Sequence, residues 1–324
     1  MDRALIIYYK EEGKKNSKFI DLFKKNGMKY GITFDYVSFE NFKKHSDVEE
    51  RLKDYSFVLN RTRHAELSLF FEKRGIKCYN SSRIVNIAND KFLTYRYIND
   101  RVRRDDFEAL IPKTAIMSGE GFCKQFNISQ VKDDDKKNGD ILFFNEYFKA
   151  YQYIDSIFMN QTGISGSSKY IVKTLNGHGG TEVILLEKQK RLYESFNQII
   201  PLIRRKNMII QEYIETQSRD LRVYVLNGEI YATVLRQGDG SFKSNYSLGG
   251  KISLYELNSQ EREYVNRFIS KLNPKEYGFI GIDFLVGEDN RLYFNEIEEM
   301  VGCRMLYALT DKDIVDDFLS TVAN

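Results

Sequence analysis

Three carboxylates lie close together near the end of the chain, in a segment that otherwise has the pattern of two paired β-strands. Residues 279–299 read FIGIDFLVGEDNRLYFNEIEE. If Gly287 pairs with Leu292, the hairpin has a four-residue loop and Asp283 lies directly opposite Glu296. Strand alternation then places Glu298 on the same face, about 7 Å from Glu296 along the strand. The pattern therefore predicts a patch of three acids.

Such a patch needs a compensating charge if it is buried. At an effective dielectric constant near 20, two like charges about 5 Å apart repel by on the order of 3 kcal/mol. A divalent cation would remove this cost, and oxygen ligands without a nearby His or Cys suit Mg²⁺ or Mn²⁺. The alternative is an exposed strand face with solvated charges, and the hairpin alone leaves both interpretations open. Glu299, the next acid, is expected to be solvated.

A glycine-rich loop forms the second feature, in YIVKTLNGHGGTEVILLE (170–187). Glycines allow backbone N–H groups to approach phosphate oxygens, and Lys173 projects from the strand that leads into the loop. The segment is also compatible with an ordinary hairpin turn. It does not have the spacing of a P-loop, so a nucleotide site of that type is not expected.

Cationic side chains alternate with apolar residues further along the chain. Asp220 and Arg222 are two residues apart, Arg236 ends a strand, and Lys243 follows in SFKSNYSLGG (241–250). If these cations converge with Lys173, they would suit a polyphosphate and the charge that moves when it is cleaved. Taken alone, the turn around Lys243 has no special meaning.

The elements that must position these residues fall into two patterns. Strands expected at 4–9, 34–39, 56–60 and 76–79 alternate with helical segments such as 64–74, which predicts a small parallel sheet up to about residue 88. From Tyr170 onward, strands with tight turns and one clear helix (259–271) predict an antiparallel-rich α+β unit. The charged segments 99–106 and 132–140 are expected to be solvated loops. We therefore divide the chain into units 1–88, 89–168 and 169–324.

Composition limits the classes of function. The 324 residues include 49 basic and 46 acidic side chains, for a net charge of +3, so nucleic acid is not an expected partner. Cys78, Cys123 and Cys303 are odd in number and lack the spacing of a zinc site or disulfide framework, which favours a reducing cytoplasm. No apolar run approaches the roughly 18 residues of a membrane span, so no membrane partner is expected.

Taken in order, these segments resemble the ATP-grasp superfamily, and within it the RimK-like carboxylate–amine ligases. The motifs are NDKFLTYRYI, IPKT, YIVKTLNGHGG, IIQEYI, RDLRVYVLNGE, FKSNYSLGG, GIDFL and FNEIEE, which lie between residues 56 and 305. The resemblance implies the ATP-grasp fold, in which a small N-terminal parallel α/β domain is followed by two α+β subdomains that clasp ATP.

The resemblance also implies roles for individual residues. The residues that match ATP-binding positions are Lys91 and Lys173 at the phosphates, Gln211, Glu212, Tyr213 and Ile214 at the adenine, Asp220, and Lys243, Ser244 and Asn245. Asp283 and Glu296 match metal ligands, and Glu298 stands where the family usually has Asn. Lys243 replaces a usual Arg, and the familiar turn after the metal strand is replaced by EMVGCRML. Arg304 in this turn would reach a substrate carboxylate or form a structural ion pair.

The implied reaction is activation of a carboxylate by the γ-phosphate of ATP, followed by attack of an amine on the acyl phosphate. Catalysis would be positioning and electrostatics, with Mg²⁺ or Mn²⁺ on the phosphates and Arg236, Lys243 and Lys173 stabilising developing charge. The partners would be a small-molecule or peptide carboxylate and an amino acid or other amine. A small-molecule kinase and a non-catalytic nucleotide-binding protein are the alternatives, and a homo-oligomer stays open.

Overall fold

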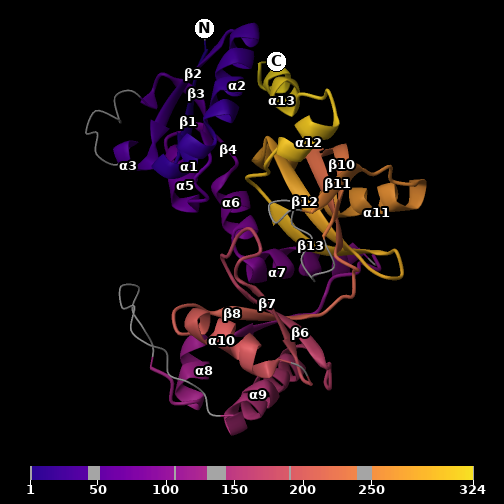
Figure 1. Cartoon of the computed structure of the whole chain (residues 1–324). Helices are drawn as coiled ribbons and strands as arrows, with labels where there is room; N and C mark the ends of the chain where they lie inside the picture. The colour runs from indigo at the N-terminus through magenta and orange to yellow at the C-terminus, as the bar shows by residue number, and fades with distance from the viewer. Residues whose placement is uncertain are drawn as a thin grey trace.

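The computed structural model describes residues 2–42, 52–105, 107–129, 144–189, 191–238 and 250–323 (Figure 1). Their strands form one parallel and two antiparallel sheets, which follow one another along the chain. This confirms the expected fold class, a parallel α/β unit followed by antiparallel-rich α+β units. No helix in these residues is long and apolar enough to span a membrane.

The first sheet has the strand order β2-β1-β3-β4, and all its described pairs are parallel. Its strands are β1 (Asp2–Tyr8), β2 (Ile32–Ser38), β3 (Tyr55–Asn60) and β4 (Lys77–Tyr79). Residues 4–8 of β1 are buried without alternation, because helices cover both faces of the sheet. The helices of this unit are α1 (Lys10–Lys15), α2 (Ser17–Gly27), α3 (Phe39–Phe42) and α5 (Ala65–Glu72).

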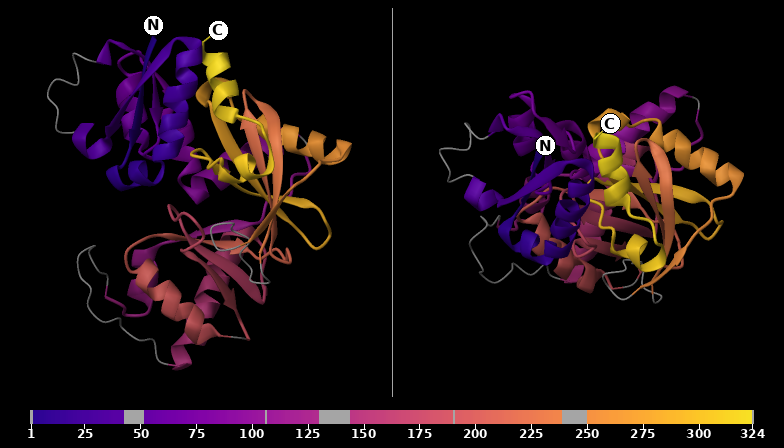
Figure 2. Two further views of the ribbon diagram at one scale, coloured as in Figure 1. Left: turned by 45° about the horizontal axis from the view of Figure 1, so that its top comes forward. Right: turned by 90° about the horizontal axis from the view of Figure 1, so that it is seen from above.

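The end of the chain returns to this first unit. Helix α13 (Ile314–Val322) packs beside α2, as both views in Figure 2 show. Asn26 Nδ2 donates to Asp313 Oδ2 at 2.7 Å, and Ile314, Phe318 and Leu319 share a core with β1 and α2. The N-terminal unit is therefore fixed to the C-terminal part of the chain.

Two helices lead from the first sheet to the second. Helix α6 (Ser82–Ala88) begins at Ser81, whose Oγ accepts from Ile84 N, and α7 (Lys91–Val102) begins at Asp90, which accepts from Phe92 N and Leu93 N. These caps satisfy free backbone donors at the helix starts. Because α7 extends to Val102, the prediction of a loop from residue 99 is wrong for 99–102, while 132–140 lies outside the described residues.

The second sheet has the order β5-β8-β6-β7 and is antiparallel. Its strands are β5 (Thr114–Met117), β6 (Lys169–Thr174), β7 (Val183–Glu187) and β8 (Met208–Glu212). One face packs against α8 (Gly119–Gln125), α9 (Phe144–Thr162) and α10 (Leu192–Ile203) (Figure 1). Helix α10 was not expected; it starts after a left-handed Arg191 without a side-chain cap and contains Pro201, so the usual signals are missing. The sheet crosses the expected boundary at residue 168, and the division into units stays a prediction.

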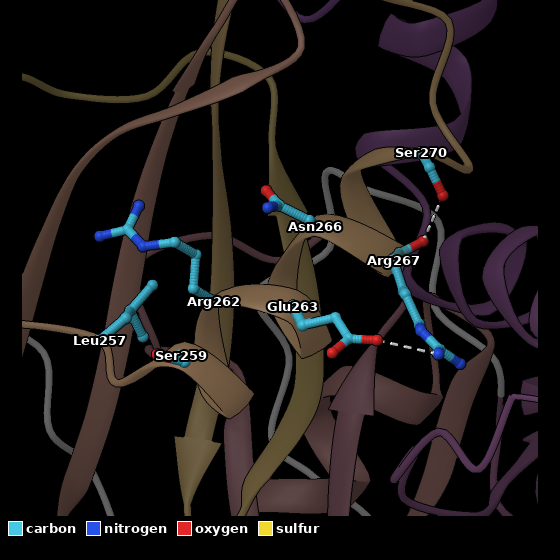
Figure 3. A pocket seen from close by; sticks show the side chains of 7 residues that line it. All are labelled: Leu257, Ser259, Arg262, Glu263, Asn266, Arg267 and Ser270. Atoms are coloured by element: carbon cyan, nitrogen blue, oxygen red, sulfur yellow. Dashed lines mark hydrogen bonds and ion pairs between the residues drawn. The ribbon is translucent and has the colours of Figure 1, made fainter.

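The third sheet has the order β11-β10-β9-β12-β13. Its strands are β9 (Arg219–Leu226), β10 (Glu229–Gln237), β11 (Lys251–Leu254), β12 (Phe279–Val286) and β13 (Leu292–Glu298), followed by α12 (Arg304–Leu309). The expected helix is present as α11 (Ser259–Ile269), which begins with a capping box formed by Asn258 and Glu261. Its outer face carries an open hollow (Figure 3), and its inner face packs on this sheet.

The β12–β13 hairpin places the acids as predicted, but by a different route. Val286, not Gly287, is the partner of Leu292, so the expected loop was one residue too short. A bulge between Phe294 and Glu296 then shifts the register, and Asp283 lies opposite Glu296. The prediction for this pair is confirmed, whereas the predicted pairing of Gly287 is wrong.

Candidate active site

Four of the predicted site residues converge on one narrow pocket where the second and third sheets meet. Its polar lining consists of Lys91, Lys173, Gln211, Asn295 and Glu296, and its other side chains are Tyr95, Ile111, Ile209 and Phe294. Lys91 starts α7, Lys173 lies on β6, and Glu296 lies on β13. An apolar wall beside two ammonium groups and a carboxylate suits a flat base joined to a polyphosphate.

Lys173 connects the two sheets across this pocket. Its Nζ donates to Asn295 Oδ1 at 3.2 Å, and Asn295 is the bulge residue of β13. Only 8% of Lys173 is exposed. Burial lowers the pKa of its ammonium group to about 8; Glu296 opposes this shift and Lys91 adds to it. The charge of Lys173 is therefore sensitive to small changes in pH.

We expect the affinity for ATP to fall as the pH rises through about 8, because Lys173 then loses the proton that attracts phosphate. Titration calorimetry with ATP from about pH 7.5 to 9.5 measures this, a range below the usual lysine pKa of about 10.4. The variant Lys173→Arg keeps its charge over the whole range, so its affinity should stay nearly constant. An equal fall in the variant would assign the pH dependence to another group.

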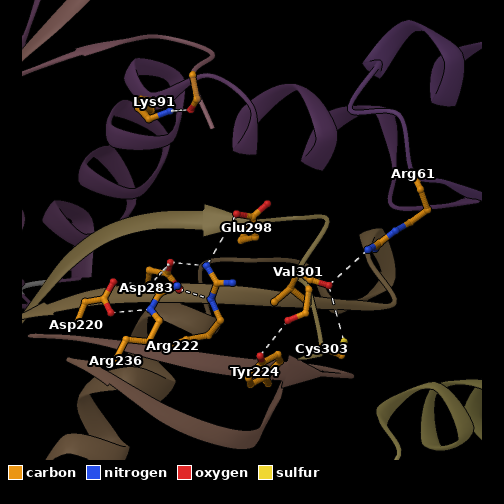
Figure 4. Close-up of polar contacts among 12 residues, drawn as sticks. Arg61, Lys91, Asp220, Arg222, Tyr224, Arg236, Asp283, Glu298, Val301 and Cys303 are labelled. Carbon is orange, nitrogen blue, oxygen red and sulfur yellow. Dashed lines mark hydrogen bonds and ion pairs between the residues drawn. The ribbon is translucent and has the colours of Figure 1, made fainter. Parts of the chain in front are cut away.

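The glycine-rich loop between β6 and β7 is attached to the start of α7. Asn176 Nδ2 donates to Asn89 O at 2.8 Å, and Lys91 N donates to Leu175 O at 3.0 Å. Lys91 Nζ donates to Gly177 O (Figure 4). Gly179 has φ +67°, a conformation that side chains with a Cβ rarely adopt. The loop and Lys91 therefore lie at the same edge of the pocket.

The expected adenine segment, residues 211–214, covers the last two residues of β8 and the two that follow it. Gln211 Nε2 donates to Thr114 Oγ1 at 3.1 Å, which fixes Gln211 to β5. Glu212 accepts from Lys113 N at 3.1 Å, which fixes it to the residue before β5. Tyr213 donates to Glu215 at 3.0 Å, and Ile214 is half-buried in the connection to β9. Of these four predicted residues, only Gln211 lines the pocket.

A buried row of alternating charges crosses the adjoining face of the third sheet (Figure 4). It consists of Arg222, Asp283, Arg236 and Asp220, and is called the Asp283 ladder below. Arg222 binds Asp283 through two hydrogen bonds, from Nε at 2.7 Å and from Nη2 at 2.6 Å. Arg236 donates to the same carboxylate at 2.7 Å and to Asp220 at 2.6 Å. Burial alone would raise the pKa of Asp283, but Arg222 and Arg236 overcome this effect and lower it to about 2. Asp283 therefore stays ionised.

The other two predicted metal ligands make fewer contacts with the protein than Asp283 does. Glu298 Oε2 lies 3.9 Å from Arg222 Nη2, and Glu296 makes no hydrogen bond or ion pair with any described residue. The carboxylate oxygens of Glu296 and Glu298 fit the preference of Mg²⁺ for oxygen ligands, whereas Asp283 faces two guanidinium groups. Among the described residues no set of three His, Cys, Asp or Glu is arranged to hold a metal ion. The three-ligand assignment stays a prediction.

Glu299 is buried, with 2% exposure, so the expectation that it is solvated is wrong. Asn80 Nδ2 donates to Glu299 Oε2 at 3.0 Å, and Asn89 Nδ2 donates to Oε1 at 3.1 Å. Both asparagines are more than 200 positions away in sequence, so local sequence reasoning could not place them here. These bonds hold the end of β13 against the start of the α6–α7 segment.

We expect Glu299→Ala to lower the free energy of unfolding by about 2 kcal/mol, because two buried amides lose a charged acceptor. Urea unfolding measures the change. The matched control is Glu256→Ala, which removes an exposed carboxylate without a described partner and should stay within about 0.5 kcal/mol of the wild type. Equal stability of the two variants would show that the bonds to Asn80 and Asn89 contribute little.

The remaining predicted residues are not brought to the pocket by the described contacts. Lys243, Ser244 and Asn245 lie outside the described residues. Arg304 is the exposed first residue of α12, and no described residue forms a hydrogen bond or ion pair with it. The roles proposed for these four residues stay predictions.

Two contacts of the site were not predicted from the sequence. The pairing of Arg222 with Asp283 could have been found, because Arg222 alternates with Asp220 on one strand face and lies directly opposite Asp283. The contact of Asn295 with Lys173 could not, because the Asn295 side chain reaches Lys173 only through the bulge in β13. Bulges of this kind leave no clear signal in a single sequence.

The arrangement of sheets is shared with solved structures of ATP-grasp proteins. One is the RimK domain ATP-grasp protein from Sphaerobacter thermophilus, with a TM-score of 0.62 and 14% identity, covering 99% of this chain and 98% of that one. At this identity the likeness shows the fold alone.

The sequence comparisons give the family. The model of the RimK-like ATP-grasp domain matches residues 141–322, which is more than half of the chain, and the chain belongs to this family. Uncharacterized protein MG011 of Mycoplasma genitalium is 23% identical over 99% of this chain and 92% of its own length. A Coxiella burnetii protein named "Probable alpha-L-glutamate ligase" is 33% identical over 46% of this chain and 48% of its own length. The family is that of the RimK-like ATP-grasp domain, and one of these relatives is named as a ligase.

Proposed function

We propose that the protein joins a carboxylate to the amine of an amino acid or peptide through an acyl phosphate. The observation that carries this proposal is the convergence of Lys91, Lys173, Gln211 and Glu296 on one pocket, next to the Asp283 ladder. The relative named as a glutamate ligase supports an acid–amine reaction.

In the proposed reaction, a carboxylate oxygen of the acid attacks the γ-phosphorus of ATP and ADP leaves. The amine nitrogen then attacks the acyl carbon, phosphate leaves, and the nitrogen loses a proton. A bound divalent cation would neutralise phosphate charge, and Glu296 and Glu298 would hold it. Lys91 and Lys173 would bind the phosphates, while Arg236, which is buried beside Asp283, would add positive charge near the reacting centre. No side chain has to act as a nucleophile.

A phosphate-release screen tests this function. Purified protein is incubated with ATP, Mg²⁺ and paired pools of carboxylates and amino acids or peptides. We expect ADP and free phosphate only when an acid and an amine are both present, together with an amide product in mass spectra. A phosphorylated product without any amine would identify a kinase. Tight ATP binding without release would identify a non-catalytic nucleotide-binding protein.

We also propose the cytoplasm as the location of the protein. Cys78, Cys123 and Cys303 are all free and buried in the described structure. Unpaired thiols persist in a reducing compartment.

A further inference from the structure

The loop that follows β3 lies at a special position of the first sheet. Strand β1 has β2 on one side and β3 on the other, so the chain reverses its direction of winding between β1 and β3. In open parallel sheets, ligands bind outside the carboxyl ends of the strands at such a point. The residues at this edge are Tyr8, at the end of β1, and the segment 60–64, which reads NRTRH.

The 60–64 loop is rigid because its first residue bonds to the rest. Asn60 Nδ2 donates to His64 O at 3.0 Å and to Ser68 Oγ at 2.8 Å. Thr62 Oγ1 donates to Asn60 Oδ1 at 2.7 Å. Side chains on a loop with so many internal bonds are held in fixed directions, as a binding site requires.

Arg61 fixes this loop to the turn that follows β13. Its side chain is buried, with Nε donating to Tyr8 Oη at 3.3 Å and Nη2 to Val301 O at 3.4 Å (Figure 4). Its guanidinium also lies 5.6 Å from the centre of the Phe19 ring. The first unit therefore meets the chain three residues after Glu298, which brings the 60–64 loop toward the candidate active site.

Arg63 has no partner among the residues that the structure describes. Its Nε is buried and lacks a hydrogen-bond acceptor, and no described residue pairs with its guanidinium. Its backbone has φ +60°, a left-handed conformation that costs about 1 kcal/mol or more in a residue with a Cβ. An ordered loop thus keeps a strained arginine whose charge is not neutralised by any described residue.

Arg63 acts on the glycine-rich loop. Partial burial, together with the positive charges of Arg63 and Lys91, lowers the pKa of His178 to about 4. His178 lies on the exposed side of this loop. The charge of Arg63 therefore acts on the same loop that Lys91 contacts.

We propose that Arg63 binds a substrate carboxylate other than the one that is activated. The inference rests on the proposed ligase function. Lys91 and Lys173 already supply cations to the pocket, whereas Arg63 approaches from the first unit. A guanidinium presents a planar pair of donors that matches the two oxygens of a carboxylate. The carboxylate belongs to a dicarboxylic acid substrate or to an amino acid that supplies the amine.

The test is titration calorimetry on the full chain in the presence of ADP and Mg²⁺. The probes are glutarate, which has two carboxylates, butyrate, which has one, and L-alanine, which is an amine with one carboxylate. The variants are Arg63→Gln, Arg63→Lys and, as a matched control, Arg262→Gln. Arg262 is exposed on the outer face of α11, where it lines the open hollow (Figure 3), and it does not line the pocket of Lys91 and Lys173.

We expect Arg63→Gln to weaken binding of glutarate or L-alanine about 10- to 100-fold, the range for a lost hydrogen bond to a charged group. Arg63→Lys should recover part of this loss and Arg262→Gln should lose nothing. A loss confined to glutarate assigns the carboxylate to the acid, and a loss confined to L-alanine assigns it to the amine. Butyrate should be affected least in the first case, because it lacks the second carboxylate.

Three results would overturn the inference: no binding of glutarate or L-alanine to the wild type, unchanged binding in Arg63→Gln, or a loss confined to ADP, which would make Arg63 a phosphate ligand. Thermal unfolding checks that each variant is folded. Failure of the proposed function is a separate result, because it is read from amide formation by the wild type. Binding that depends on Arg63 without any amide product would retain the inference and reject the ligase.

Discussion

Glu296→Gln should abolish ADP formation while the protein stays folded. Glu296 lines the pocket with Lys91 and Lys173 and lies opposite Asp283, and its side chain bonds to no described residue. The substitution keeps its size but removes the charge that a divalent cation would bind. Losing one such electrostatic contribution to the transition state slows turnover by about 100-fold or more. Coupled ADP detection with ATP, Mg²⁺ and an active substrate pair measures it.

The control for this experiment is Glu256→Gln, which neutralises an exposed carboxylate between β11 and α11 and should keep full turnover. The unfolding midpoint of Glu296→Gln should equal that of the wild type, since no described bond is lost. Full turnover in Glu296→Gln would exclude a metal-binding role for this residue. A large fall in its stability would instead indicate a structural role.

Arg222→Met should lower the free energy of unfolding by about 3 to 5 kcal/mol, the cost of breaking a buried ion pair from one side. Arg222 and Asp283 are 8% and 1% exposed, so the remaining carboxylate would stay buried with Arg236 as its other cationic partner. The pKa of Asp283 should rise, because Arg222 is the first of the charges that lower it. Stability in the variant should then depend less on Asp283 ionisation at low pH. Urea unfolding at neutral and acidic pH measures both effects.

The matched control is Arg267→Met on α11. Arg267 also binds a carboxylate, Glu263, at 3.0 Å, but the two side chains are 48% and 70% exposed (Figure 3). Exposed pairs of this kind contribute about 0.3 to 0.5 kcal/mol. If Arg222→Met were no more destabilising than Arg267→Met, the Asp283 ladder would not hold the third sheet together.

Several parts of this protein could be predicted from local patterns. The run ALIIYY predicts a strand of the first α/β unit, and the alternation around Asp283 and Glu296 predicts their shared face. The second case succeeds although the loop was misjudged, because the bulge in β13 compensates for the extra loop residue. Side-chain periodicity along a strand is a local property, so the sequence carries it directly.

Other parts depended on contacts between distant segments. Helix α10 lacks the usual start signal, and it is stabilised by packing on the second sheet. Glu299 looks like one more charge in an acidic run, yet Asn80 and Asn89 enclose it. The role of Asn295 depends on a bulge. Tertiary context overrides local preference in each case.

The sequence by itself determined the kinds of side chain available to the site: two lysines, a run of acids, and basic residues on neighbouring strands. It also determined the strand periodicity that puts Asp283 beside Glu296. Only the tertiary structure decided how these charges are used. It engages Asp283 with Arg222 and Arg236, buries Glu299, and leaves Glu296 and Arg63, the latter at the edge of the first sheet, without a described partner. The physical reason is that charge pairing and desolvation depend on distance in space, which residues far apart in sequence acquire only when the sheets pack together.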